Sequence, residues 1–175
     1  MDIKQPAGHI DQMIRQTRAH HVTLSSLADK KANMMLTIAS LMIPLSTGFL
    51  YEDRSHLAAA TLIGFCVLTI LLAAYSAMPK IKPANESEKK PDLNENSFNL
   101  LFFGSFVHME YQDFADEMAR MMNDHNHVYE AQLREIYTMG QYLAKKKYKF
   151  LQLSYYSFIV GILFSSCIFI LGSYT

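Results

Sequence analysis

Positively charged and amide side chains gather beside two of the chain's uncharged stretches, and such groups could bind an anion. Residues 29–33 read Asp-Lys-Lys-Ala-Asn, and four more lysines, Lys145, Lys146, Lys147 and Lys149, precede the last apolar segment. Ammonium and amide groups donate hydrogen bonds to phosphate oxygens. Lysines in such places also serve as interfacial anchors that extend to lipid headgroups, and composition alone favours that second interpretation.

Histidine-containing stretches are weaker candidates for chemistry. Residues 124–127 read Asp-His-Asn-His, but a metal site needs three or four convergent donors, so we expect a polar helix cap here. His20 and His21 would point about 100° apart on a helix, so at most one faces a core. The sequence contains no glycine-rich phosphate loop, G-x-S-x-G or H-E-x-x-H motif. We therefore predict no enzyme activity, catalytic residue, cofactor or metal.

The composition is that of a membrane protein rather than a nucleic-acid-binding one. Of 175 residues, 50% are hydrophobic and 18% are charged, and Lys plus Arg equal Asp plus Glu at 16 each. A chain without net positive charge has no general attraction for nucleic acid. Cys66 and Cys167 both lie in apolar runs, where we expect reduced packing residues. The length excludes a large multidomain enzyme.

Three uncharged stretches predict three transmembrane helices, over residues 32–51, 57–78 and 150–173. At about 1.5 Å per residue, each is long enough to cross a hydrocarbon core of about 30 Å. Lys and Arg number five before the first stretch and ten between the second and third, against Arg54 alone in the other loop. The positive-inside rule then predicts a multi-pass membrane protein with a cytoplasmic N-terminus and the C-terminus outside the cytoplasm.

The remaining segments predict cytoplasmic helices. Residues 1–31 form an amphipathic helix, 79–97 a proline-rich and charged linker, and 98–149 further helices that include a short apolar one at the membrane surface or in the bundle. The expected apolar stripe of the N-terminal helix comprises Ile10, Met13, Thr17, Leu24, Leu27 and Lys31. That of the last helix, from about Asp124 to Gly172, comprises Tyr129, Leu133, Ile136, Gly140 and Leu143. The predicted fold is an all-α membrane protein in which these two helices run parallel and pair with each other or with a second protomer.

The order of motifs resembles a known family. Ala-Asp-Lys-Lys-Ala at residues 28–32 opens a span, Asn-Leu-Leu-Phe-Phe-Gly follows at 99–104, and residues 129–137 and 143–148 lead into the last span. From about residue 10 to 172 the chain resembles the transmembrane effectors of Pycsar, the pyrimidine cyclase anti-phage systems. The resemblance implies an effector that binds a cyclic pyrimidine mononucleotide, cCMP or cUMP, made by a partner cyclase. The resemblance also implies that the effector, once it has bound this nucleotide, impairs the inner membrane and arrests growth.

A ligand of that kind needs a cation, an aromatic platform and amide donors. We expect the phosphate to contact Lys30, Lys31, Arg134 or Lys145, with Arg134 preferred because it lies away from the lipid. Candidates for stacking are Phe103, Tyr129 and Tyr137, and candidates for the base or ribose are Asn33 and Asn99. We also expect a homo-oligomer. The alternatives are a constitutive membrane scaffold and a haem or metal subunit that uses His20, His21 and His108.

Overall fold

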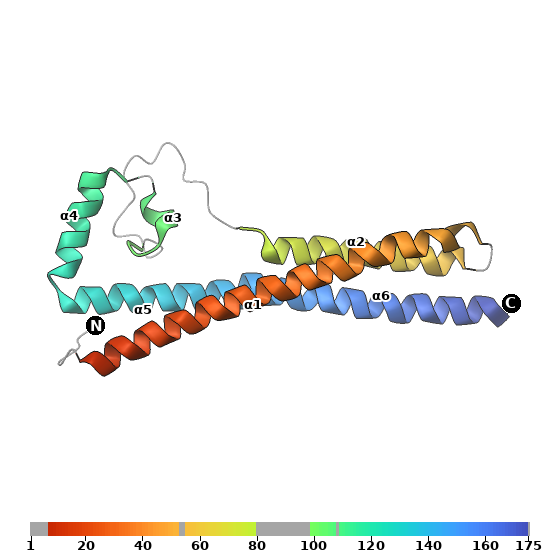
Figure 1. The fold of residues 1–175 in the computed structure, drawn as a ribbon, viewed down its shortest axis with the longest axis horizontal. Helices are drawn as coiled ribbons and strands as arrows, with labels where there is room; N and C mark the ends of the chain where they lie inside the picture. Colours follow the sequence, from red (N-terminus) through yellow and green to blue (C-terminus); the bar gives the residue numbers. More distant parts are fainter. Residues whose placement is uncertain (1–6, 53–54, 80–98, 108, 175) are drawn as a thin grey trace. The chain divides into compact units, whose positions relative to one another are not determined.

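The computed structural model describes residues 7–52, 55–79, 99–107 and 109–174, and within them it contains helices and turns but no strands. This confirms the all-α class (Figure 1). The elements, in chain order, are α1 (Gly8–Thr47), η1 (Gly48–Tyr51), α2 (His56–Ala77), α3 (Phe103–Phe106), α4 (Tyr111–Met122), α5 (His125–Tyr142), η2 (Leu143–Tyr148) and α6 (Lys149–Tyr174).

Three helical runs are long and apolar enough to cross a membrane, as predicted: Gly8–Tyr51, His56–Ala77 and His125–Gly172. The first and third extend well beyond their apolar parts, so the amphipathic segment and the span at each place form one helical run. Pro44 lies inside α1 without ending it. The third run includes a π-helical turn, η2, between α5 and α6.

The chain divides into two compact units, and each is described by itself. The first comprises described residues of segments 1–22 and 79–141, and the second those of 23–78 and 142–175. Because α1 crosses the first boundary and the α5–α6 run crosses the second, both units contain parts of these two runs. The predicted linker, residues 79–97, lies outside the described residues except for Pro79.

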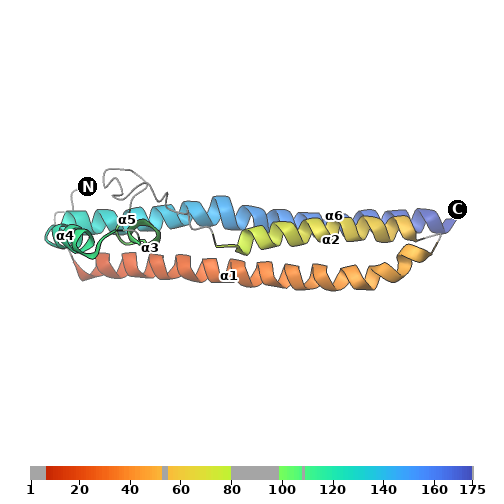
Figure 2. The same cartoon turned by 90° about the horizontal axis from the view of Figure 1, so that it is seen from above.

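Small side chains join the helices of the second unit. Helices α2 and α6 lie side by side in both views (Figures 1 and 2). Thr69 Oγ1 lies 3.2 Å from Ser157 Oγ, and the Ser165 hydroxyl donates to the carbonyl of Ala58 at 2.9 Å. Small residues of this kind permit the close helix approach on which packing in a membrane depends.

The buried face of α1 differs from the predicted stripe. Met13 and Leu27 are 58% and 43% exposed, whereas Ile14 and Ala28, one position later, are buried. In the second unit, Ala28 and Ala32 pack with Leu151 in an apolar cluster. Alanine allows close contact between helices, so its positions face the neighbouring helix and the larger apolar residues remain outside. The stripe of α5 was predicted correctly at its ends, since Tyr129 and Leu143 are buried.

The short apolar helix expected before residue 122 is interrupted. Helix α3 has four residues and α4 begins after Glu110, whose backbone is extended. Before α3, the Asn99 side chain accepts a hydrogen bond from the Leu101 amide at 3.0 Å. Such local bonds between a side chain and the backbone compete with helical ones, which explains the turn ahead of α3.

Candidate functional site

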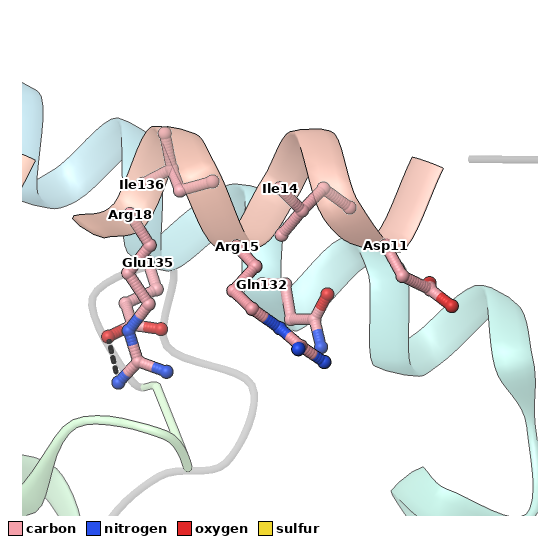
Figure 3. Close-up of a pocket in the computed structure, with 7 residues that line it drawn as sticks. All are labelled: Asp11, Ile14, Arg15, Arg18, Gln132, Glu135 and Ile136. Carbon is pink, nitrogen blue, oxygen red and sulfur yellow. Dashed lines mark ion pairs between the residues drawn. The ribbon is translucent and has the colours of Figure 1, made fainter. Parts of the chain in front are cut away.

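A pocket of about 340 Å³ lies between the first turns of α1 and the middle of α5, within the first unit (Figure 3). It is lined by Asp11, Ile14, Arg15, Arg18, Gln132, Glu135 and Ile136. The spacings of three and four place the four residues of α1 on one helix face, and the same holds for the three of α5. Apolar side chains and oppositely charged groups therefore meet in one volume of ligand size.

Two polar contacts hold the two walls of the pocket together. The hydroxyl of Tyr129 donates to Asp11 Oδ1 at 2.6 Å, and Arg18 Nη2 lies 3.0 Å from Glu135 Oε1. Because the higher-numbered residue of α1 pairs with the higher-numbered residue of α5, the two segments run parallel, as predicted. The hydrogen bond to Asp11 raises the pKa of Tyr129, and burial of the ring acts in the same direction.

The pocket leaves hydrogen-bonding capacity unused within the described part of the chain. Glu135 Oε2 is buried there and has no hydrogen-bond partner. Arg15 lines the pocket and forms no ion pair with any described residue. A buried carboxylate oxygen without a donor is costly, so a ligand that brings one would be stabilised here. A ligand that also carries an anion would find the Arg15 guanidinium.

Five of the predicted site residues belong to the first unit, and none of them lines the pocket. Tyr129 is buried and fixes Asp11 at the pocket wall, so it acts on the pocket through another residue. Arg134 forms an ion pair with Glu130, one turn earlier on the same helix, at 3.2 Å. Tyr137 is 68% exposed.

The other two residues of this group lie around α3. Asn99 is buried and stabilises the turn before that helix. Its backbone amide donates to Ser105 Oγ at 3.4 Å. Phe103 is 53% exposed, and its ring centroid lies 5.0 Å from that of Phe102. The hydrogen bonds of Asn99 therefore stabilise the local turn rather than a ligand site.

Lys30, Lys31, Asn33 and Lys145 belong to the second unit, and all four are exposed. The predicted residues are thus divided between two units, and the pocket contains different ones: Arg15, Arg18, Gln132 and Glu135. The sequence did carry a signal for these, namely polar residues spaced by three or four beside the apolar stripe. Surface faces of helices carry the same pattern, so it did not distinguish them.

Lys147 was predicted to be part of a surface lysine ring, but it is buried. Its ammonium group donates to Asp29 Oδ1 and Oδ2, each at 2.7 Å, and to Ser25 Oγ at 2.8 Å. Its carbonyl accepts from the Ser76 hydroxyl at 2.9 Å, so this one residue links α1, α2 and the π-helical turn. Turns of this kind contain one extra residue and are frequent at functional positions.

The polar stretch before α5 caps that helix. Asp124 Oδ1 accepts from the amide of Asn126 at 2.9 Å, as expected for an N-cap. This hydrogen bond is the largest cause that lowers the pKa of Asp124, and the neighbouring His127 adds to it.

Two of the histidines of the alternative haem or metal interpretation, His20 and His21, do not line this pocket. His20 is exposed, and His21 is partly buried near Gly140. His108 lies outside the described residues. Among the residues that are described, no three His, Cys, Asp or Glu side chains gather as a metal site would require.

Comparison with known protein families gives a match that covers most of the chain. The family model described as the Pycsar effector protein domain matches residues 12–172. No curated protein and no solved structure matches the chain significantly. The matched residues include the pocket except Asp11, the apolar parts of all three long helices, and the contact between Lys147 and Asp29.

Proposed function

Because this chain belongs to the Pycsar effector protein family, we propose that its pocket between α1 and α5 binds a cyclic pyrimidine mononucleotide, cCMP or cUMP. Binding then leads to impairment of the inner membrane. Family membership makes the protein a Pycsar anti-phage effector, and its three apolar helices make it a membrane protein. The observation that carries the ligand proposal is the pocket itself, where Arg15 and the unpartnered Glu135 Oε2 meet.

The anionic part of the nucleotide suits Arg15. A cyclic monophosphate carries one negative charge, and a guanidinium can donate two parallel hydrogen bonds to two of its oxygens. Arg18 already pairs with Glu135 at 3.0 Å, so its charge is largely used in holding that carboxylate. Arg15 has no such commitment to another described residue, which makes it the preferred phosphate contact.

The neutral part of the nucleotide suits the other pocket residues. Glu135 Oε2 can accept a hydrogen bond from a ribose hydroxyl or from a base N–H. Gln132 offers an amide that both donates and accepts, as the polar edge of a pyrimidine requires. Ile14 and Ile136 supply apolar surface for the planar base and the sugar. This replaces the aromatic platform that the sequence led us to expect.

The membrane response would follow from the helices that bind the ligand. α1 continues without interruption to Thr47, and α5 is followed directly by η2 and α6. A ligand that prefers one arrangement of the pocket walls biases the equilibrium between two arrangements by its differential affinity alone. A preference of about 100-fold supplies about 2.7 kcal/mol. We propose that this bias alters the membrane segments of the same helices.

Membrane impairment also implies assembly, since three helices alone enclose no aqueous path. We therefore propose a homo-oligomer, to be tested by mass measurement in detergent with and without nucleotide. Ile136, whose stripe position made it a candidate for the oligomer contact, lines the pocket inside one protomer. Ile136→Asp would consequently disturb the pocket and is not a clean test of assembly.

Calorimetric titration of the full chain in detergent with cCMP, cUMP and cAMP tests the ligand proposal. We expect one of the two pyrimidine nucleotides to bind, and Arg15→Ala to weaken it by roughly 10-fold to 100-fold through loss of a charged hydrogen bond. Arg120→Ala is the matched control, because Arg120 is exposed and, among the described residues, forms its ion pair locally, with Glu117 at 2.7 Å. Parent protein that binds neither pyrimidine nucleotide would favour the scaffold interpretation instead.

Arg134→Ala decides between Arg15 and Arg134, the candidate that the sequence favoured, as the phosphate contact. If Arg15 is the contact, Arg134→Ala binds as the parent does, because Arg134 lies outside the pocket. A loss of binding in Arg134→Ala together with normal binding in Arg15→Ala would return the phosphate site to the position first expected from sequence. Tyr129→Phe adds a further arm, since it removes only the hydroxyl that holds Asp11.

A further inference from the structure

The lysines beside the membrane segments of the second unit differ in one respect that sequence did not reveal. Lys147 is buried, but the other five lysines of that unit are exposed. We call these five the boundary lysines: Lys30, Lys31, Lys145, Lys146 and Lys149. Because Lys147 contacts Asp29 at 2.7 Å, the lysines next to each of these two residues lie at the same height along the helices of this unit.

Within the described residues of the second unit, no acidic side chain beside the boundary lysines is left to neutralise them. Between residues 23 and 51, and from 142 to the last residue, Asp29 is the only Asp or Glu in the sequence. Both of its carboxylate oxygens accept hydrogen bonds from Lys147. The internal ion pair thus uses the one carboxylate of these two segments, and five positive charges remain on them at the point where apolar helices begin.

We propose that the boundary lysines form a binding surface for the headgroups of anionic phospholipids. The partner follows from position as well as charge. Residues 34–51 and 150–172 continue from this level as apolar helical segments with exposed apolar side chains, so the anion must lie at the edge of a bilayer. Lysine is suited to this role because its long apolar stem can lie along the helix while the ammonium group reaches the headgroup.

This inference is independent of nucleotide binding. For Lys30, Lys31 and Lys145 it agrees with the anchoring role that composition favoured, and it differs from their alternative assignment as contacts of the nucleotide phosphate. Both a lipid headgroup and a nucleotide supply phosphate oxygens. We commit to the lipid because the nucleotide pocket lies in the first unit and contains its own arginines. Each lysine near an anionic surface contributes about fivefold to the binding preference, from about 1 kcal/mol.

Tryptophan fluorescence gives a direct test, because the chain contains no Trp. Leu153→Trp places a single reporter four residues after Lys149, at a side chain that is 40% exposed on α6. The full chain is reconstituted into phosphatidylcholine with either brominated phosphatidylcholine or brominated phosphatidylglycerol carrying the same acyl chains. The ratio of quenching by the two brominated lipids measures headgroup preference. Quenching by brominated phosphatidylcholine shows that the variant is in the bilayer.

We expect the parent to prefer phosphatidylglycerol at least fivefold, and the variant with all five boundary lysines changed to Gln to show a ratio near one. The corresponding Lys→Arg variant should keep the parent's ratio, as should the control Arg120→Gln. Phosphate or cCMP added at constant ionic strength should leave the ratio unchanged. A parent ratio of one, or an unchanged ratio in the Gln variant, overturns the proposal, and displacement by free phosphate assigns the surface to a soluble anion instead. If the five-Gln variant fails to insert, two smaller variants take its place: Lys30→Gln with Lys31→Gln, and Lys→Gln at 145, 146 and 149. Each should then show a quenching ratio between that of the parent and one, and an unchanged ratio in both overturns the proposal.

Discussion

The ammonium group of Lys147 lies 2.7 Å from each carboxylate oxygen of Asp29, but the two partners are not equally buried. The side chain of Lys147 is 9% exposed and that of Asp29 is 40% exposed. The cost of separating them therefore depends on which partner is left behind. An isolated buried ammonium group cannot recover its hydration, whereas a carboxylate at the surface can.

Asp29→Ala should accordingly destabilise the protein more than Lys147→Met does. We expect a loss of about 3 kcal/mol for the first, which leaves a buried charge whose remaining partner among the described residues is Ser25. For the second we expect a loss of about 1 kcal/mol, because Asp29 stays solvated. Thermal unfolding in detergent measures both. The double variant Asp29→Asn with Lys147→Met should recover part of the loss, and an equal effect of the two single variants would contradict the asymmetry.

Gly161→Ala tests the contact between α2 and α6. A Cβ atom at Gly161 would overlap the Cβ and ring of Phe65, so the two helices would have to separate. We expect a loss of about 1–3 kcal/mol from this overpacking. Gly64→Ala is the matched control, because a Cβ there meets no atom within 4 Å. Helix-pair stability can be followed by thermal unfolding, and the control should be neutral or slightly stabilising.

The first turn of α5 should lose protection at acid pH through Asp124. Its pKa is lowered in the folded protein, chiefly by the Asn126 amide, so the carboxylate's stabilising effect is present above the unfolded pKa of about 3.9. It is lost as pH falls through the lower folded pKa. Hydrogen exchange of the amides of residues 126–128 should show lower protection factors at pH 3 than at pH 6. Asp124→Asn should remove most of this pH dependence.

Reporter fusions test the predicted orientation, which rests on fifteen basic residues on one side against Arg54 on the other. A reporter after Thr175 should lie outside the cytoplasm and one inserted at Asn85 inside. Lys→Gln changes at the boundary lysines should weaken this orientation because they remove five of the fifteen charges. A cytoplasmic reporter at Thr175 in the parent chain would contradict the orientation.

The long helices were predictable because each depends on the character of many consecutive residues. Uncharged length identified three apolar helices, and the spacing from Tyr129 to Leu143 identified a buried residue in α5 and another at the start of η2. The face of α1 was misassigned by one position, because the pattern gave weight to Met13 and Leu27 and little to Ala28 and Ala32. Hydrophobic size predicts burial poorly where the closest contacts need small side chains.

The pocket could not be derived in the same way, because it depends on which polar residues face each other across two helices. Arg15 and Arg134 look alike in sequence, yet only Arg15 lines the pocket, while Arg134 pairs with Glu130 on its own helix. Similarly, Lys147 is buried while its lysine neighbours are exposed, because Lys147 faces Asp29 and Ser25 of α1. Pairing between distant segments decides both cases.

The π-helical turn at Leu143–Tyr148 has a consequence for how this protein tolerates insertions and deletions. Such a turn holds one residue more than α-helical winding would, and each residue of an α-helix advances it by about 100°. Removing one exposed residue, such as Ala144, would let this segment wind as an α-helix, and Leu151 would keep its phase against Leu143 because the extra residue is the one removed. The same deletion inside α6 would rotate every later residue by about 100°. We therefore expect a one-residue deletion in this hexapeptide to be tolerated better than a one-residue deletion within α6.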